Sequence, residues 1–208
     1  MITYSISQFK IDIGTHPTRN EVFPRRKGEF DKYETFFNVS DDAPYDNTIT
    51  WRDDASVHWF PINEFGYWTY QPFYWLVRLL DEAIKENKEI YLHCHAGAHR
   101  SPMMAYLYIR SLGFSPEESY AKFAESNTLG ERTNWLEETF QHDIEYGRIP
   151  SDVVEFMQDV RANKDLSMMS VMKKRGVMDL PQKTIDKRGT RKPVGEAQIA
   201  LEKKGLFS

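Results

Sequence analysis

Cysteine is scarce in this sequence of 208 residues, which contains only Cys94. One cysteine cannot form an internal disulfide framework, and a free thiol is typical of a reducing compartment. The sequence also lacks the run of about 18 apolar residues that a transmembrane helix needs. Its first ten residues, MITYSISQFK, do not have the basic-then-apolar layout of a signal peptide. These absences predict a cytoplasmic protein without a membrane partner.

The charge is distributed unevenly along the chain. Residues 161–208 carry 12 Lys and Arg against 5 Asp and Glu, whereas residues 1–160 carry 15 against 26. We therefore expect one acidic globular domain over 1–160 and a basic, flexible C-terminal tail over 161–208, rich in Gly and Pro. The acidic domain disfavours broad nucleic-acid binding, although the basic tail leaves such binding open. The sequence does not predict the oligomeric state.

The order of strand and helix patterns predicts an α/β fold, with a central mostly parallel or mixed sheet flanked by helices. Buried strands are expected at residues 34–42, 56–62 and 88–94, where β-branched and aromatic runs meet polar turns or proline. Apolar residues from 71 to 86 recur at helical spacing, so we expect a crossover unit whose parallel strands are neighbours. Four further helices are expected at residues 102–112, 115–123, 133–144 and 151–160.

The stretch HCHAGAHRSP, residues 93–102, joins the third expected strand to a helix with Ser101 as its N-cap. Such a loop points backbone amides into a small bowl that binds a tetrahedral anion. The positive electrostatic field of these amides and of the helix N-terminus also favours the thiolate of Cys94. Arg100 offers a planar, two-pronged donor that matches two phosphate oxygens. This arrangement suits displacement through a phosphocysteine. The expected substrate-binding residues are those of the loop: His95, Ala96, Gly97, Ala98, His99 and Arg100.

Other residues of the loop have narrower expected roles. Gly97 lets the backbone bend back where a Cβ would obstruct it. Ser101 can donate a hydrogen bond to the sulfur when it departs in the second step. His95 and His99 are either rim residues without a special role or extra positive charge for a highly charged substrate.

Two other interpretations of Cys94 compete with this one. A buried structural cysteine is common, but it explains neither the spacing of Gly97, Arg100 and Ser101 nor the strand-to-helix context. A metal site is the second alternative, because His and Cys are ligand types. Four ligands within seven residues, however, leave little room for the groups that orient them. We therefore expect no metal and no cofactor.

The motif HCHAGAHRS resembles the H-C-x-x-G-x-x-R-S/T signature of the protein tyrosine phosphatase superfamily, most of all its dual-specificity branch. The flanking segments FFNVSDD, WFPINE and NWLEETF are similar to other parts of that branch, so the resemblance covers about residues 30–145. It implies the cysteine-phosphatase fold, with the phosphate-binding loop between a strand and a helix. All five fixed positions of the signature match: His93, Cys94, Gly97, Arg100 and Ser101.

The resemblance also implies a function and two supporting residues. His93 would support the thiolate through loop hydrogen bonds rather than act as a base. Asn134 is similar to an asparagine that steadies the loop or the hydrolytic water, or simply caps a late helix. The implied activity is hydrolysis of phosphotyrosine in a phosphorylated protein partner, through a phosphocysteine. Phosphoserine and phosphothreonine are further candidate substrates.

The general acid is the point at which the sequence departs from the family pattern. A leaving alkoxide or phenoxide needs a proton, and the family places an aspartate about 30 residues before the cysteine. Counting back from Cys94 reaches Glu64 instead. Asp42 and Asp41 follow the first expected strand and are the alternatives. We expect Glu64 to be the acid, with Asp42 or Asp41 next.

The substrate is open to several interpretations. Tyr67 and Trp68 come just after Glu64, and they either line the mouth of the pocket or belong to the core. The same chemistry could act on an RNA 5′-triphosphate or an inositol phosphate. A third possibility, from another class, is a phosphate-binding module without turnover.

Overall fold

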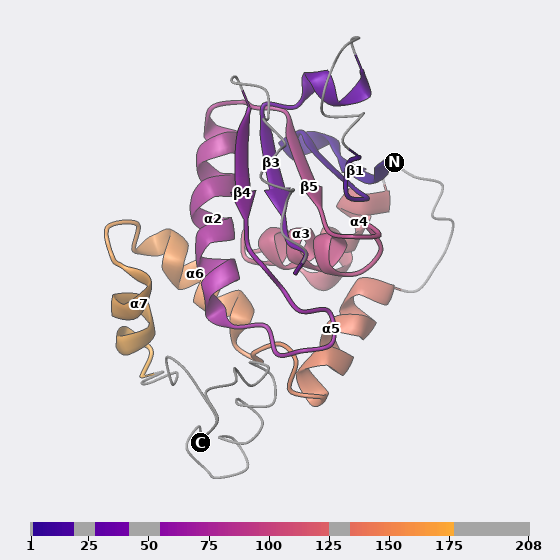
Figure 1. Cartoon of the computed structure of the whole chain (residues 1–208). Coiled ribbons are helices and arrows are strands. Elements are labelled where there is room, and N and C mark those ends of the chain that lie inside the picture. The colour runs from indigo at the N-terminus through magenta and orange to yellow at the C-terminus, as the bar shows by residue number, and fades with distance from the viewer. Residues whose placement is uncertain (1, 19–27, 42–54, 125–133, 177–208) are drawn as a thin grey trace, which may run out of the picture.

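A five-stranded sheet lies at the centre of the structure, a computed structural model that describes residues 2–18, 28–41, 55–124 and 134–176 (Figure 1). The strand order is β1-β2-β5-β3-β4, in which β1 and β2 form an antiparallel hairpin and all other neighbours are parallel. The predicted α/β class with a mixed, mostly parallel sheet is confirmed. The bounds are Ile2–Ile6 (β1), Ile11–Gly14 (β2), Thr35–Asn38 (β3), Ser56–Trp59 (β4) and Ile90–His93 (β5).

The helix α3 is the central one, as its apolar sequence predicts. It contacts β5 and β2 of the sheet and also α2, α4, α5 and α6. Every residue of α3 from Arg100 to Ile109 is buried. No helix within the described ranges is long and apolar enough to cross a membrane. The bounds are Tyr70–Lys85 (α2), Arg100–Arg110 (α3), Pro116–Ala124 (α4), Trp135–Glu145 (α5), Val153–Ala162 (α6) and Met168–Lys174 (α7), with short 3₁₀ helices at Ser7–Phe9 (η1) and Glu29–Lys32 (η2).

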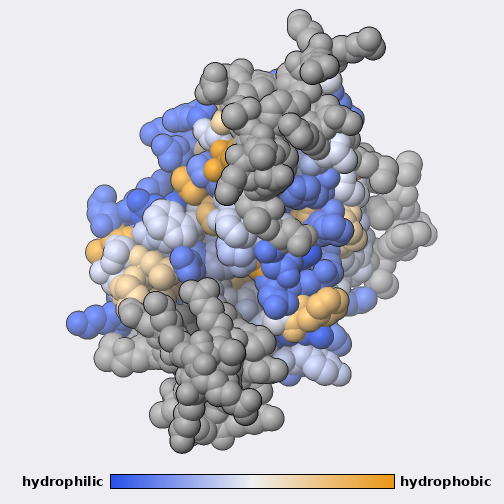
Figure 2. Space-filling view, viewed as in Figure 1, coloured by the Kyte–Doolittle hydropathy of each residue, from blue (hydrophilic) through white to orange (hydrophobic). Residues whose placement is uncertain are grey.

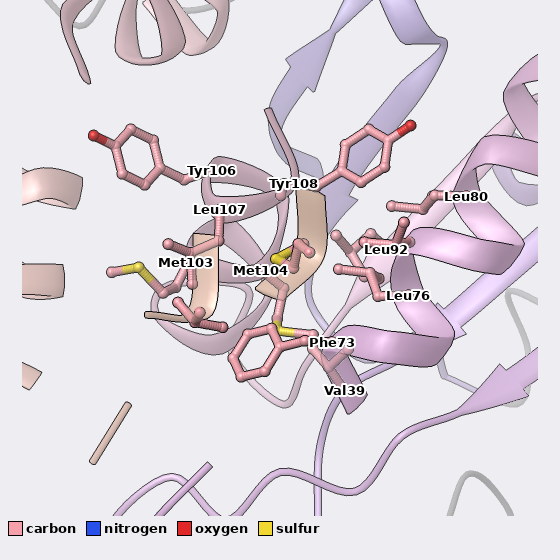
Figure 3. Close-up of a cluster of buried hydrophobic side chains, with 14 of the residues drawn as sticks. Val39, Phe73, Leu76, Leu80, Leu92, Met103, Met104, Tyr106, Leu107 and Tyr108 are labelled. Carbon is pink, nitrogen blue, oxygen red and sulfur yellow. The ribbon is translucent and has the colours of Figure 1, made fainter. Parts of the chain in front are cut away.

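Most of the core lies between the helices and one face of the sheet. Figure 3 shows Leu76 and Leu80 of α2 facing Leu92 of β5 and Met104 of α3. Each fully buried side chain of this size stabilises the fold by roughly 1.5–3 kcal/mol. This packing fixes the end of β5 and the start of α3, which are the two ends of the HCHAGAHRS loop.

The opposite face of the sheet has a smaller apolar cluster. Successive strand residues alternate between faces, so Phe37 belongs to the main core and Phe36 to the small cluster. In that cluster Phe36 and Tyr91 pack against Phe30 and Tyr33, in and just after η2. Both faces of β3 and β5 are therefore covered, which explains why all four residues of each strand are buried.

Two features of the sheet differ from the sequence-based prediction. The β1–β2 hairpin is not predicted, because its left-handed turn residue is Lys10, with φ of 53°, rather than the usual Gly or Asn. The expected strands 56–62 and 88–94 are parallel but are not neighbours, since β3 lies between β4 and β5. A local sequence pattern can show that two strands are joined by a crossover helix. It cannot show that a third strand, β3, lies between them in the sheet.

The domain boundary predicted at residue 160 falls inside α6. The chain continues to α7, which buries Val171 and Met172 and is held to α6 by the Arg175 ion pairs with Asp152 and Asp159. The folded domain therefore includes residues up to Gly176. The basic charge of this segment, which suggested a tail, is partly neutralised by acidic partners. The rest of the predicted tail, 177–208, lies outside the described residues.

The surface in Figure 2 is mostly hydrophilic where it is coloured, and its apolar residues form small groups. Scattered apolar side chains are ordinary on a protein surface. Phe65 is different, because 81% of it is exposed. The large exposed hydrophobic residues in the described ranges are Trp59, Phe65, Trp75, Tyr146 and Met169.

Candidate active site

The loop between β5 and α3 places Cys94 at the bottom of the site. Cys94 is 2% exposed, and Ser101 in the first turn of α3 donates a hydrogen bond to its sulfur, with Oγ to Sγ 3.4 Å. The helix begins at Arg100, with His99 as its N-cap, slightly before the predicted start at Ser101 and Pro102. Cys94, Arg100 and Ser101 thus lie together in the predicted strand–loop–helix unit.

Gly97 is required by the shape of the loop. Its φ is 67°, and a Cβ added there would lie 2.4 Å from the carbonyl carbon of Gly14 in β2. The carbonyl oxygen of Gly97 also accepts a hydrogen bond from Thr3 Oγ1 at 2.9 Å, and His16 N donates to His95 O at 3.0 Å. The β1–β2 hairpin, which the sequence does not predict, therefore supports the loop from beside it.

His93 is a neutral supporting residue. Burial, together with the nearby His16, lowers the pKa of His93 to about 3, so its ring is uncharged at neutral pH. Its Nδ1 lies 3.4 Å from the carbonyl oxygen of Cys94. Because it is fully buried and its pKa is so low, this imidazole is too weak a base to take a proton from substrate, and its Nδ1 contacts the backbone of the loop.

The Arg100 guanidinium brings the two described candidate acids together. Its Nη1 donates to the Asp41 carboxylate and to Ile62 O, and the distance to Ile62 O is 3.0 Å. Its Nη2 donates to Glu64 Oε2 at 3.3 Å. The Arg100 side chain is 4% exposed, against 50% for Asp41 and 40% for Glu64. Both carboxylates follow the ends of parallel strands, at the edge where α/β folds bind ligands. Asp42 lies outside the described residues.

A tight turn fixes the backbone around Glu64. Asn63 organises it: its side-chain Oδ1 accepts from Phe65 N at 3.0 Å, and its carbonyl oxygen accepts from Gly66 N at 3.3 Å. The same carbonyl accepts from the indole nitrogen of Trp68 at 3.1 Å. Glu64 is therefore presented on a hydrogen-bonded turn, and its own side chain is half-exposed beside Arg100.

The exposed aromatic residue beside Glu64 is Phe65. Tyr67 and Trp68, which the sequence offers for this position, are 7% and 1% exposed and belong to the core. Trp68 is drawn inward because its backbone N donates to Arg148 O and its indole donates to Asn63 O. The side chain of Phe65, next to Glu64, is the one left in solvent.

The sequence analysis missed Asp143 and its link to the loop. Asp143 is 1% exposed and its Oδ2 lies 3.3 Å from His99 Nε2. Burial alone would raise the pKa of Asp143, but the hydrogen bond and charge of His99, together with Arg148, lower it overall. The signal was present: Asp143 shares the buried face of α5 with Leu136 and Phe140, at helical spacing.

The remaining predicted site residues have simpler places. Asn134 is the N-cap of α5: its Oδ1 accepts from Glu137 N at 3.1 Å and its Nδ2 donates to Pro116 O at 2.9 Å. Its contacts thus hold two helices together rather than the loop. His95, Ala96 and Ala98 are exposed along the rim of the loop. The described ranges contain no group of three or more His, Cys, Asp or Glu that could hold a metal ion.

Comparison with known proteins gives matches only at the level of structure. No protein-family model and no curated protein matches the sequence. The solved structure of PTPMT1 matches with a TM-score of 0.50 and 17% identity, over 78% of this chain and 98% of that one. Tk-PTP in its active form gives 0.47 and 18%, over 65% and 91%, and human DUSP28 gives 0.48 and 11%, over 69% and 99%. With its HCHAGAHRS loop between β5 and α3, the chain has the protein tyrosine phosphatase fold, as the resemblance of its loop implies.

Proposed function

We propose that the protein is a cysteine-dependent phosphatase that hydrolyses phosphate monoesters through a phosphocysteine intermediate. The observation that carries the proposal is the placement of Cys94 Sγ beside Ser101 Oγ, with the Arg100 guanidinium in the same buried loop. A structural cysteine would need neither partner. The fold of PTPMT1 supports the same conclusion.

In the first step the substrate phosphoryl group enters the loop, and two of its oxygens accept hydrogen bonds from the Arg100 guanidinium. Arg100 then exchanges its contacts with Asp41 and Glu64 for the phosphoryl oxygens. The Cys94 thiolate attacks phosphorus, the bond to the leaving oxygen breaks, and a protonated carboxyl group supplies the proton to that oxygen.

In the second step water attacks the phosphorus of the phosphocysteine. The carboxylate formed in the first step takes a proton from this water, and the phosphorus–sulfur bond breaks to give orthophosphate. Ser101 Oγ, already 3.4 Å from the sulfur, donates its hydrogen bond to the departing thiolate. The enzyme returns to its starting state without a cofactor.

Glu64 is the proposed general acid. It sits on the turn held by Asn63 and Trp68, whereas Asp41 lies three residues after the end of β3 and is the more exposed of the two. The fixed turn limits the positions that the longer glutamate side chain can reach. This restriction favours catalysis, because the acid has to be held close to the leaving oxygen. Asp41 is the alternative, because it contacts the same guanidinium.

Phosphotyrosine in a protein is the proposed substrate. Cys94 lies at the bottom of the site and is 2% exposed, so a long, flat aryl phosphate reaches it more easily than a short phosphoserine. Phe65, exposed beside Glu64, offers an apolar surface to the aryl ring. Exposed His95 on the rim favours a second candidate, a polyanion such as an inositol phosphate. PTPMT1 itself has been solved in complex with PI(5)P.

A substrate panel with two proteins tests the proposal. The wild type and Cys94→Ser are assayed on a nitrophenyl phosphate, a phosphotyrosine peptide, a phosphoserine peptide, an inositol phosphate and an RNA 5′-triphosphate. We expect wild-type turnover to be fastest on the phosphotyrosine peptide among the natural groups, and none in Cys94→Ser. Binding of orthophosphate by both proteins without any hydrolysis would identify a phosphate-binding module instead.

A further inference from the structure

Asp143 is the only buried carboxylate among the residues that the structure describes. A carboxylate without water is costly unless cations and hydrogen bonds surround it. Its Oδ2 lies 3.3 Å from His99 Nε2, and its Oδ1 lies 3.3 Å from Arg148 Nη1 and 3.7 Å from His142 Nδ1. Of these partners, His99 belongs to the phosphate loop.

His99 is a sensitive point of the loop, because it directly precedes Arg100 and begins α3. Its carbonyl oxygen accepts the hydrogen bond of Met103 N at 3.0 Å in the first turn. Its ring is held between the Asp143 carboxylate and the indole of Trp68, whose centroid is 5.7 Å away. A displacement of this ring therefore moves the backbone that carries Arg100.

The same carboxylate is connected to the turn that presents Glu64. Arg148, its second partner, accepts a hydrogen bond from Trp68 N at its carbonyl oxygen. Trp68 in turn donates to Asn63 O, in the turn beside Glu64. Asp143 thus lies where supports of the phosphate loop and of the acid turn meet.

We propose that Asp143 is a positioning residue: it holds His99 through Nε2 and thereby sets the place of Arg100 and the loop amides around the phosphoryl group. The kinetic test of this inference rests on the proposed function, because it measures phosphatase activity. Asp143 and His99 do not touch the substrate in this account. With its Nε2 turned to Asp143, His99 supports the loop rather than adding charge for the substrate.

The test compares two substitutions of His99 that are similar in size. His99→Gln retains a donor near the position of Nε2, whereas His99→Leu retains packing against Trp68 and loses the donor. We expect kcat on nitrophenyl phosphate to fall about 10- to 100-fold in His99→Leu, with His99→Gln close to the wild type. Equal activity of the two variants would overturn the proposal, because the ring would then act by packing alone.

A double-mutant cycle tests the role of Asp143. Asp143→Asn is expected to lower kcat about as much as His99→Leu, and the double variant to lose no more than the worse single one. The control is Asp81→Asn, which removes a partner of Arg161 and Tyr108 away from the loop, and which is expected to lower the thermal midpoint with kcat unchanged. A lower midpoint without a kcat effect in Asp143→Asn, or multiplicative losses in the cycle, would contradict the proposal.

Direct binding of orthophosphate separates this inference from the proposed function. If the wild type hydrolyses nothing, the phosphatase proposal fails, and the dissociation constant for orthophosphate becomes the readout. A weaker constant in His99→Leu than in His99→Gln still supports the positioning role. Equal constants in the two variants would overturn it.

Discussion

The phosphate loop and the acid side of the site are built in different ways. Cys94, Arg100 and Ser101 are at most 3% exposed and lie between a buried strand and the central helix. Asp41 and Glu64, by contrast, extend from loops into solvent, and their shared contact in the structure is the Arg100 guanidinium. In the proposed reaction the loop therefore binds phosphate without rearranging its backbone, whereas the acid reaches its working position only when Arg100 exchanges partners.

This difference teaches which parts of the site depend on packing. The loop has several fixed contacts. Gly97 lies against Gly14 and accepts from Thr3, the carbonyl oxygen of Cys94 contacts His93, and His99 contacts Asp143. The carboxylates are held differently: the backbone at Glu64 is fixed by its turn, and the side chains of Asp41 and Glu64 are half-exposed and bound to Arg100. Placement of the nucleophile therefore depends on packing, whereas placement of the acid depends on the turn at Glu64 and on the contact with Arg100.

The largest predicted loss comes from breaking the loop itself. Arg100→Lys keeps the charge but replaces a two-pronged donor with one ammonium group. We expect kcat/KM on nitrophenyl phosphate to fall by at least about 100-fold. Arg161→Lys, in a half-buried ion pair away from the site, is the control and should leave the rate unchanged. A mild effect of Arg100→Lys would mean that this arginine is structural.

The second prediction sharpens the acid side. Glu64→Gln is expected to slow hydrolysis of a phosphotyrosine peptide about 10- to 100-fold, and to slow an activated nitrophenyl phosphate much less. The reason is that a poor leaving group needs the proton and a good one does not. Asp41→Asn, measured beside it, should show no such dependence. The reverse result would move the acid to the β3 loop, and no dependence in either would give the proton to another donor or to water.

A third prediction removes a part that lies outside both regions. Truncation after Asp165 deletes α7 with buried Val171 and Met172, which costs roughly 3 kcal/mol or more of unfolding free energy. Truncation after Gly176 keeps this packing and should leave both the stability and the hydrolysis of nitrophenyl phosphate unchanged. Chemical denaturation of the two truncated proteins measures the difference. Equal stabilities would show that α7 adds little to the domain.

The smallest predicted effect concerns the support below the loop. The pKa of His93 is about 3 in the folded protein, and it returns to the ordinary value near 6.5 on unfolding. Between these values the unfolded state binds more protons, so stability is lost as the pH falls from about 6.5 toward 3. From pH 7 to 4.5 the loss due to His93 is roughly 2–3 kcal/mol. In His93→Asn this part of the acid sensitivity should disappear, and an unchanged pH dependence would contradict it.

The sequence predicted the loop far better than its surroundings. Strand, glycine, arginine and helix follow one another in a few residues, so local patterns were enough for β5, the loop and α3. The β1–β2 hairpin was missed because Lys10 occupies a left-handed turn position that favours Gly or Asn. Local patterns also cannot tell which aromatic is buried. The backbone N of buried Trp68 donates to distant Arg148, whereas the backbone N of exposed Phe65 donates within its own turn, to Asn63 Oδ1.

The central claim is that Cys94 is the nucleophile, and rapid acid quench of the enzyme during turnover tests it most directly. Phosphocysteine should be retained long enough for mass spectrometry of the digested protein when a good leaving group makes the first step fast. We predict one phosphoryl group on the peptide that contains Cys94, absent from Cys94→Ser, whose loop should still bind orthophosphate. Turnover with no phosphorylated cysteine, or hydrolysis that persists in Cys94→Ser, would contradict the account.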